Sequence, residues 1–358
     1  MKAKEIAKEL GISPATVSLA LNDRPGVSRE TRERVMDYVY QKEEEFLEGR
    51  IRQVDLHQAK GTVLMLNYVK NGTIMEQKER FQLPSSSGSP TLIEKAAQIS
   101  AGRGYRFRYR IFRERHHSLD QLLQECRDTG VSGIYILAAE MFPGDIYPFR
   151  NLNIPIVIGD NLFYEEGIDS YLIDNQEGIA RCVDYLADKG HSHIAYLAEN
   201  INIFNFAERR DAFLMEMMKR GMGDARNRIW YLGSSINEVY DSMKRNLDRG
   251  IQRTTAFVLE SSVVSLGVCK ALMERQVRIP RDLSLIGFDA VTPDSLPGVE
   301  LTLIKGTHTK RHLAGIRHLM EHMEDGNEEI MKVYYHTKLL EGNSVFDKTR
   351  FIYKTQRG

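Results

Sequence analysis

The chain has 358 residues, and its 49 lysines and arginines balance its 49 aspartates and glutamates. A chain of this length is expected to form two or three domains rather than one core. The charge balance excludes nucleic-acid binding through overall charge, so any such binding must come from a local basic surface.

The chain begins with a charged, amphipathic stretch, and no later run reaches the roughly 18 apolar residues that a membrane-spanning helix needs. The three cysteines, Cys126, Cys182 and Cys269, have neither a disulfide-like nor a zinc-like spacing. These features predict a cytoplasmic protein without a membrane partner.

Three short helices are predicted at the start of the chain. Residues 3–10 carry apolar side chains at helical spacing and are followed by a glycine. Ser13 can cap a second helix that runs to Asn22, with Pro14 at the position where a missing N–H costs nothing. Small and hydroxyl-bearing side chains on its outer face suit a DNA groove, and a third helix begins at Ser28. A helix-turn-helix and a compact three-helix cap without DNA function share this periodicity.

The residue order in this region resembles the LacI/GalR family of repressors, in residues 6–22 (IAKELGISPATVSLALN) and 25–32 (PGVSRETR). The resemblance implies that Pro14, Ala15 and Leu19 read bases in the major groove. The other predicted DNA-binding residues hold the phosphate backbone or cap the second helix: Ser13, Thr16, Ser18, Asn22, Ser28 and Thr31.

Leu19 stands where many members of this family carry an arginine that bonds to guanine. A leucine offers only apolar contact, for which the thymine methyl group is the natural partner. We therefore expect a readout opposite Leu19 that tolerates A·T pairs.

The connector departs from the family pattern. Family members usually have a Tyr-x-Pro-Asn turn and then a hinge helix whose leucine enters the minor groove, whereas residues 49–60 read GRIRQVDLHQAK. A basic and apolar segment can still enter a minor groove, but the spacing selects no single residue for it. We assign residues 1–48 to the headpiece and 49–60 to an atypical linker.

From residue 61 onward, short apolar runs alternate with helical patterns, which predicts parallel sheets covered by helices. Ligands in such folds lie beyond the carboxyl ends of the strands, so a cleft between two lobes is expected. The strings that resemble the LacI/GalR core are residues 173–178 (IDNQEG), 190–197 (GHSHIAYL), 209–213 (RRDAF), 279–289 (IPRDLSLIGFD) and 301–302 (LT).

The resemblance implies an all-α helix-turn-helix headpiece followed by an α/β core like the periplasmic binding proteins, with two Rossmann-like parallel-sheet lobes. Residues 61–165 and 292–325 are assigned to the first lobe. Residues 166–291 and 326–350 are assigned to the second lobe.

The resemblance also implies that Arg209, Asp289 and Asp160 hold the ligand. A guanidinium fork facing carboxylates suits vicinal hydroxyl groups. The alternative is that Arg209 and Asp289 only form an ion pair between the lobes.

Three further side chains complete the predicted effector site. Many family members have Asn-Asp where this chain has Glu260 and Ser261 within residues 259–262, so either residue could suit a different ligand. Tyr68 and Phe163 follow strands and could stack on a sugar ring or close the core.

No motif of an enzyme is present: the sequence has no nucleophile elbow, phosphate loop or dinucleotide fingerprint, so neither catalysis nor a cofactor is predicted. The histidine pairs at 116–117 and at 191 and 193 have no constellation of further ligands around them in the sequence. We therefore expect no metal site.

The sequence predicts a DNA-binding transcriptional regulator of the repressor type, controlled by a small molecule, a sugar or sugar derivative, bound between two lobes. One recognition helix contacts too few base pairs for genomic specificity, so we expect a homodimer on a near-palindromic DNA operator. The alternative is a sugar-binding protein of transport or chemotaxis, against which the helix-turn-helix and the missing export signal both argue.

Overall fold

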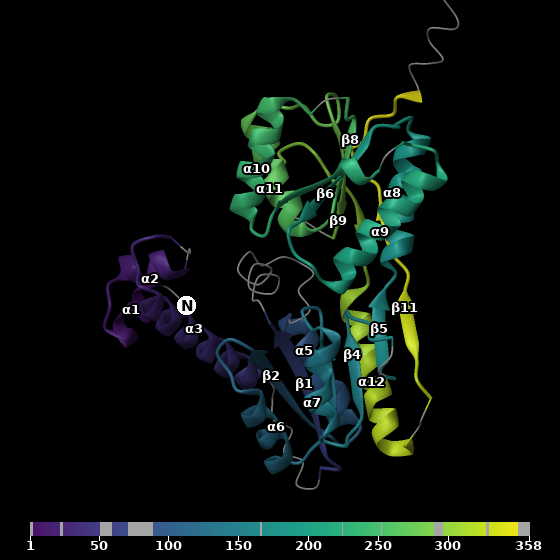
Figure 1. The fold of residues 1–358 in the computed structure, drawn as a ribbon. Coiled ribbons are helices and arrows are strands. Elements are labelled where there is room, and N and C mark those ends of the chain that lie inside the picture. Colours follow the sequence, from purple (N-terminus) through teal and green to yellow (C-terminus); the bar gives the residue numbers. More distant parts are fainter. Residues whose placement is uncertain are drawn as a thin grey trace, which may run out of the picture.

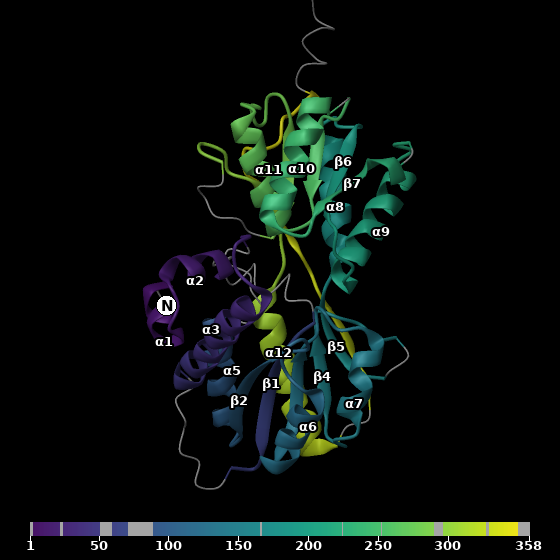
Figure 2. The ribbon, with the colours of Figure 1, turned by 60° about the vertical axis from the view of Figure 1, so that its left-hand side comes forward.

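The computed structural model describes residues 3–21, 24–50, 59–70, 89–164, 167–223, 225–251, 253–289, 296–326 and 329–349. These residues form a helical headpiece and two α/β lobes. The lobes are stacked one above the other, and the headpiece lies beside the first lobe (Figures 1 and 2). No helix among the described residues is both long and apolar enough to cross a membrane.

The headpiece consists of α1 (Ala3–Leu10), α2 (Pro14–Leu21) and α3 (Arg29–Arg50). Gly11 has a φ of +67°, which lets the chain turn sharply between α1 and α2. The three helices share a small apolar core, which confirms the predicted helix-turn-helix unit. Its buried members are Ile6, Ala7, Val17, Ala20 and Val35.

The first lobe is a six-stranded sheet with the order β11-β5-β4-β3-β1-β2, and all of its described pairings are parallel. One face is covered by α5 and α12, and the other by α6 and α7. The strands are β1 (Thr62–Val69), β2 (Arg106–Arg113), β3 (Val131–Leu137), β4 (Ile156–Gly159), β5 (Asp169–Ile173) and β11 (Lys332–Tyr335). The helices are α5 (Pro90–Gly102), α6 (Leu119–Asp128), η1 (Pro143–Ile146), α7 (Tyr147–Arg150) and α12 (His308–Asp325).

The second lobe repeats this design with the strand order β12-β10-β9-β8-β6-β7, in which only the described edge strand β12 runs antiparallel. One face is covered by α8 and α9, and the other by α10 and α11. The strands are β6 (Ile194–Glu199), β7 (Ile229–Gly233), β8 (Ala256–Leu259), β9 (Ser284–Phe288), β10 (Thr302–Lys305) and β12 (Lys338–Leu340). The helices are α8 (Asn175–Asp188), α9 (Phe204–Lys219), η2 (Arg226–Arg228), α10 (Ile236–Arg249) and α11 (Ser262–Glu274).

Within the described residues, the chain passes between the lobes after β5, between β10 and α12, and between β11 and β12. The predicted domain ranges place these passages differently, because they put β5 and β11 in the second lobe and β10 in the first. Strand pairing reverses each assignment: β5 pairs with β4, β11 with β5, and β10 with β9. Short apolar strands fit either sheet by pattern alone, so only pairing decides their lobe.

The third helix of the headpiece continues as one helix beyond the predicted boundary at residue 48. It packs on the first lobe beside β2, where the Arg113 guanidinium lies 3.5 Å from the centre of the Tyr40 ring. His116 Nδ1 lies 3.1 Å from Asp37 Oδ1 at the same contact. Residues 51–58 lie outside the described part, so the prediction of an atypical hinge stays a prediction.

Candidate DNA interface and effector site

The first predicted interface comprises Ser13 and residues along α2. Ser13, Pro14, Ala15 and Ser18 are exposed there, whereas Thr16 and Leu19 are half-buried. Ser13 Oγ accepts a hydrogen bond from the Thr16 amide at 3.0 Å and lies 2.8 Å from Thr16 Oγ1, so this pair caps the helix. The predicted contact Asn22 lies outside the described residues.

The third helix begins with the same arrangement. Ser28 Oγ accepts a hydrogen bond from the Thr31 amide at 3.2 Å and lies 2.8 Å from Thr31 Oγ1. Arg32 donates hydrogen bonds to the carbonyl oxygens of Ala20, at 3.3 Å, and Arg24, at 2.8 Å, and so fixes the turn after α2. These caps and the Arg32 contacts orient the exposed end of α2, and they leave the side chains of Pro14, Ala15 and Leu19 out of the capping hydrogen bonds.

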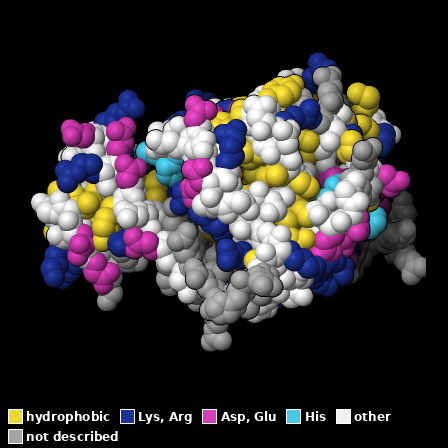
Figure 3. Space-filling model, turned by 90° about the horizontal axis from the view of Figure 1, so that it is seen from below, with side chains coloured by type: hydrophobic (Ala, Val, Ile, Leu, Met, Phe, Trp, Pro, Cys, Tyr) yellow, Lys and Arg dark blue, Asp and Glu magenta, His cyan; other side chains and the backbone are white. Residues whose placement is uncertain are grey.

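Charges of both signs are mixed over the headpiece, on the left of the face that Figure 3 shows. Positive and negative side chains are therefore intermixed on this face of the headpiece, as they are balanced in the whole chain. The local basic surface that the charge balance requires for nucleic-acid binding is not apparent among the described residues on this face.

Two aspartates occupy equivalent places in the two lobes. Asp160 directly follows β4 and Asp289 directly follows β9, which are the third strands of their sheets in the matching strand orders. Both residues have left-handed backbones, with φ of +67° and +68°, and both are buried. A positive φ is costly outside glycine, so the surrounding contacts hold these two strand ends in place.

Arg209 reaches Asp289 from α9 of the same lobe. Its Nε donates to Asn175 Oδ1 at 2.8 Å and its Nη1 to the Glu260 carbonyl at 2.7 Å, while its guanidinium lies 3.5 Å from the centre of the Phe288 ring. Nη2 is 4.0 Å from Asp289 Oδ2, which is longer than a hydrogen bond. Both side chains belong to the second lobe, so this pair does not join the lobes.

The lobes are joined by polar contacts on either side of this pair. Asn205 on α9 donates from Nδ2 to the backbone carbonyl of Asp160 at 3.1 Å. His308, at the start of α12, has its Nε2 at 2.9 Å from Asp289 Oδ1. Each aspartate is thus in contact with a residue of the opposite lobe.

The Asp160 carboxylate is committed to its own lobe. Its Oδ1 accepts a hydrogen bond from Arg311 Nη2 at 2.6 Å, and its Oδ2 lies 3.4 Å from His312 Nε2. Arg311 is fully buried and also donates to the Tyr171 carbonyl at 2.6 Å. Burial, followed by the neighbouring Arg311 charge, holds the pKa of His312 well below its ordinary value.

Glu260 and Ser261 serve the second lobe. The Glu260 carboxylate is fully buried, accepts hydrogen bonds from Arg210 Nε at 2.7 Å and the Glu199 amide at 2.7 Å, and has a pKa raised by that burial. Ser261 Oγ caps α11 by accepting from the Val264 amide at 3.2 Å, and it donates to Glu199. The side chains of both residues therefore form their hydrogen bonds within the second lobe.

Tyr68 and Phe163 lie in the core of the first lobe, which is the alternative that the sequence left open. The Tyr68 hydroxyl donates to Glu114 Oε1 at 3.2 Å, and its ring packs on Phe112 with centroids 5.1 Å apart. Both aromatic rings stabilise the lobe by apolar burial.

Sequence reasoning missed four residues of this junction: Asn175, Asn205, His308 and Arg311. Asn175 lies inside a string that matches the family, so its place could have been noticed. The other three lie on α9 and α12 without a motif, and only the packing of the lobes brings them to the aspartates.

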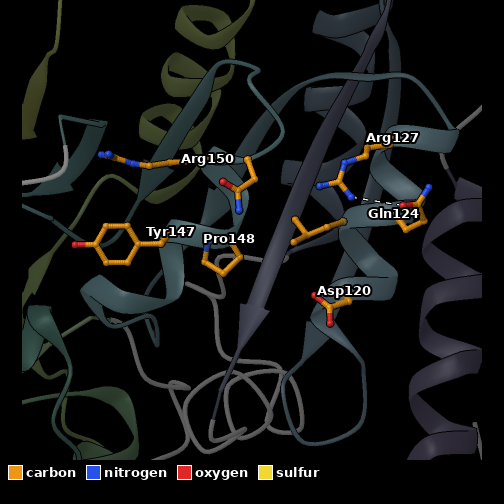
Figure 4. A pocket seen from close by; sticks show the side chains of 8 residues that line it. Asp120, Gln124, Arg127, Tyr147, Pro148 and Arg150 are labelled. Atoms are coloured by element: carbon orange, nitrogen blue, oxygen red, sulfur yellow. Dashed lines mark hydrogen bonds between the residues drawn. The ribbon is translucent and has the colours of Figure 1, made fainter.

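A separate hollow lies on the outer side of the first lobe between α6 and α7. Figure 4 shows Gln124 and Arg127 on one side of it and Tyr147 and Arg150 on the other. Arg127 Nη1 donates to Gln124 Oε1 at 3.5 Å. None of the predicted effector residues lines this hollow.

The fold and the two sites define a class of protein in which a helix-turn-helix headpiece precedes a two-lobed α/β core. Residues 2–42 match the family described as bacterial regulatory proteins, lacI family, and residues 183–345 match the periplasmic binding protein-like domain. The chain thus combines a helix-turn-helix region of the lacI family with a periplasmic binding protein-like domain.

Relatives and solved structures agree with this assignment along the chain. The HTH-type transcriptional repressor PurR of Actinobacillus pleuropneumoniae serotype 3 is 24% identical and covers 90% of each chain. The probable HTH-type transcriptional repressor ExuR of Bacillus subtilis is 21% identical, with 96% of this chain and 97% of ExuR covered. The structure of a CelR–cellobiose complex has a TM-score of 0.67 at 20% identity and covers 96% of this chain and 99% of that one. A LacI family regulator from Enterococcus faecium with bound ribose has a TM-score of 0.64 at 17% identity, covering 80% and 99%.

Proposed function

We propose that this protein is a transcriptional repressor that binds operator DNA through α2 and is controlled by a sugar or sugar derivative held between the lobes. The single observation that carries the effector proposal is the convergence of Arg209 and Asp289 beside the contacts that join the lobes. Its place of action is the cytoplasm, where chromosomal operators are found.

The proposed ligand grip consists of Arg209 and Asp289, with Asp160 positioning the opposite strand end. Arg209 is oriented by Asn175 and by the Phe288 ring, so its fork is held ready for a bidentate contact. Hydroxyl groups of a sugar can accept from the guanidinium and donate to the Asp289 carboxylate. The grip does not include Tyr68, Phe163 and Ser261, whose side chains are committed within their own lobes.

The proposed switch is a change in the angle between the lobes. A ligand that contacts Arg209 and Asp289 competes with the contact between His308 and Asp289 that joins the lobes, and so favours one lobe arrangement. A useful switch requires a difference in affinity between the two arrangements of about 1 to 3 kcal/mol. The headpiece follows the first lobe because α3 packs on β2 through Tyr40 and Arg113.

The proposed assembly on DNA is a homodimer on a near-palindromic operator. The exposed residues at the start of α2 form one small contact surface, and two copies related by a two-fold axis give the specificity that one copy lacks.

Thermal-shift screening against sugars, sugar phosphates and nucleosides tests the effector site. We expect one class to stabilise the protein and the effect to disappear in Arg209→Ala and Asp289→Ala. The control is Arg181→Ala, which removes an exposed arginine on α8 that pairs with Glu177. Stabilisation that survives both substitutions would place the effector elsewhere.

Selection of DNA sites from a random library tests the operator interface. We expect a two-fold symmetric consensus that tolerates A·T pairs opposite Leu19. A strict guanine requirement at that position contradicts the Leu19 readout, and the absence of any enriched sequence favours the alternative of a sugar-binding protein of transport or chemotaxis.

A further inference from the structure

The second half of α12 presents two histidines one turn apart. His318 and His322 are four residues apart, so their side chains lie on the same face of the helix. This face is directed at Asp169, the first residue of β5. The helix α12 lies beside β5 in the first lobe (Figure 1). The three side chains belong to β5 and α12 of the first lobe, whereas Arg209 and Asp289 belong to the second lobe.

The ligand atoms of these residues are spaced as a metal ion requires. Nε2 of His318 lies 3.4 Å from Asp169 Oδ1, and Nε2 of His322 lies 3.6 Å from Asp169 Oδ2. All three residues offer a ligand atom within 4.8 Å of the others. Tetrahedral zinc with bonds of about 2.1 Å separates its ligand atoms by roughly 3.4 Å, so one ion fits between them with little movement.

The Nε2 atoms of His318 and His322 both need a partner. The side chains of His318 and His322 are only 7% and 11% exposed, and Asp169 is 5% exposed. Neither Nε2 atom forms a hydrogen bond, although buried polar atoms in native proteins are nearly always bonded. The two nitrogens point at a carboxylate but stay beyond the roughly 2.7–2.9 Å of a charge-assisted hydrogen bond. An ion between the three groups would satisfy all of them.

A backbone amide orients the carboxylate, and two side chains lie beside one imidazole. Asp169 Oδ1 accepts a hydrogen bond from the Met331 amide at 2.6 Å, just before β11. Nδ1 of His318 lies 3.8 Å from Glu321 Oε2, and the Tyr171 ring packs on the His318 ring with centroids 5.9 Å apart. A carboxylate behind a ligating imidazole is a frequent outer partner in metal sites.

We propose that Asp169, His318 and His322 form a binding site for a first-row divalent metal ion, with zinc as the fitting ion. Two imidazoles and one carboxylate suit zinc, and related ions of this row bind the same donors. The ion ties α12 to β5 and to the start of β11, so it stiffens the first lobe. This proposal departs from the expectation of no metal, which weighed only the histidines near residues 116 and 191.

A second cluster on the second lobe makes a useful contrast. Asp174, Glu177 and His336 also bring ligand atoms together, but the Glu177 carboxylate already accepts hydrogen bonds from Arg181, at 2.7 Å, and from the Thr337 amide, at 2.9 Å. His336 is 85% exposed. This cluster has partners of its own and serves as the control.

Zinc titration of the full chain tests the site. The protein is stripped with a chelator and titrated with Zn²⁺ in competition with a chromogenic chelator. We expect one tight equivalent, and we expect Asp169→Asn, His318→Asn and His322→Asn each to weaken binding by at least about 100-fold, since loss of an outer partner alone costs about 10- to 100-fold. The control His336→Asn should bind zinc as the wild type does.

Two outcomes overturn the proposal: a wild type that binds no zinc at micromolar concentration, or any of the three variants that keeps wild-type affinity. If a variant fails to fold, the wild type alone decides. The X-ray absorption spectrum of the zinc-loaded wild type must then show two imidazole nitrogens at about 2.0–2.1 Å. A spectrum without imidazole scattering rejects the site.

Discussion

The two lobes share one strand order, yet the equivalent aspartates Asp160 and Asp289 have different partners. Asp160 of the first lobe forms a hydrogen-bonded ion pair with the fully buried Arg311. Asp289 of the second lobe faces Arg209 at 4.0 Å, and that arginine has other acceptors in Asn175 and Glu260. The same fold position therefore holds a structural anchor in one lobe and a proposed ligand contact in the other. Position in a fold alone does not assign a role, because the partner side chain decides it.

The largest expected effect comes from breaking the first-lobe pair. Asp160→Asn leaves the buried Arg311 guanidinium without its countercharge and should lower the free energy of unfolding by about 3 to 5 kcal/mol. The matched change Asp289→Asn should cost about 1 to 3 kcal/mol, because Arg209 keeps its other hydrogen bonds. Urea denaturation of both variants measures this, and equal losses would contradict the difference between the lobes.

A smaller effect on stability comes from Glu177 on α8, which accepts hydrogen bonds from Thr337 in the segment between β11 and β12. Burial alone would raise the pKa of Glu177, but hydrogen bonds from Arg181, Thr337 and His336 outweigh it and lower the pKa to about 2. The ordinary value is 4.5, so the folded state binds fewer protons than the unfolded chain between these two pH values.

The sign of the pH effect follows from this lowered pKa. The stabilising contribution of Glu177 is complete above pH 4.5 and disappears as the pH falls toward 2, by about 3 kcal/mol at most. Glu177→Gln should lack this part of the acid dependence. Denaturation curves of wild type and variant recorded between pH 5 and 2.5 should converge at the acid end, and parallel pH profiles would speak against it.

The headpiece offers a similar comparison on a smaller scale, since α2 and α3 begin with the same Ser–Thr cap. Ser13→Ala and Ser28→Ala should each destabilise the headpiece by about 1 kcal/mol, because each removes one cap hydrogen bond. Thermal unfolding of the two variants measures this cost. Unequal losses well beyond that size would show that one serine has a further structural role.

The smallest expected change in stability comes from a substitution on the exposed side of α2, and its effect is measured on DNA binding. Ala15→Ser leaves the cap intact on an exposed position, so unfolding should change by less than about 0.5 kcal/mol. If Ala15 contacts a base, the selected operator sequence should change at one position in each half-site. An unchanged consensus removes Ala15 from the proposed interface.

The helix-turn-helix, the alternation of strands and helices and the two-lobed plan follow from the sequence by itself. Spacing of apolar residues, the Ser13–Pro14 start of α2 and the matching family strings are local signals, and local signals survive in a single sequence. The same reasoning pointed to Arg209, Asp289 and Asp160, because each belongs to or follows such a signal.

Only the tertiary structure decided which lobe contains β5, β10 and β11, and which partners the two aspartates have. Pairing partners and ion pairs depend on residues far apart in the chain, such as Asp160 with Arg311 and Asp169 with His318. A periodicity describes the face that a residue occupies but not what lies against it. The physical reason is that burial and charge act through space, so distant residues acquire their roles only when the chain has folded.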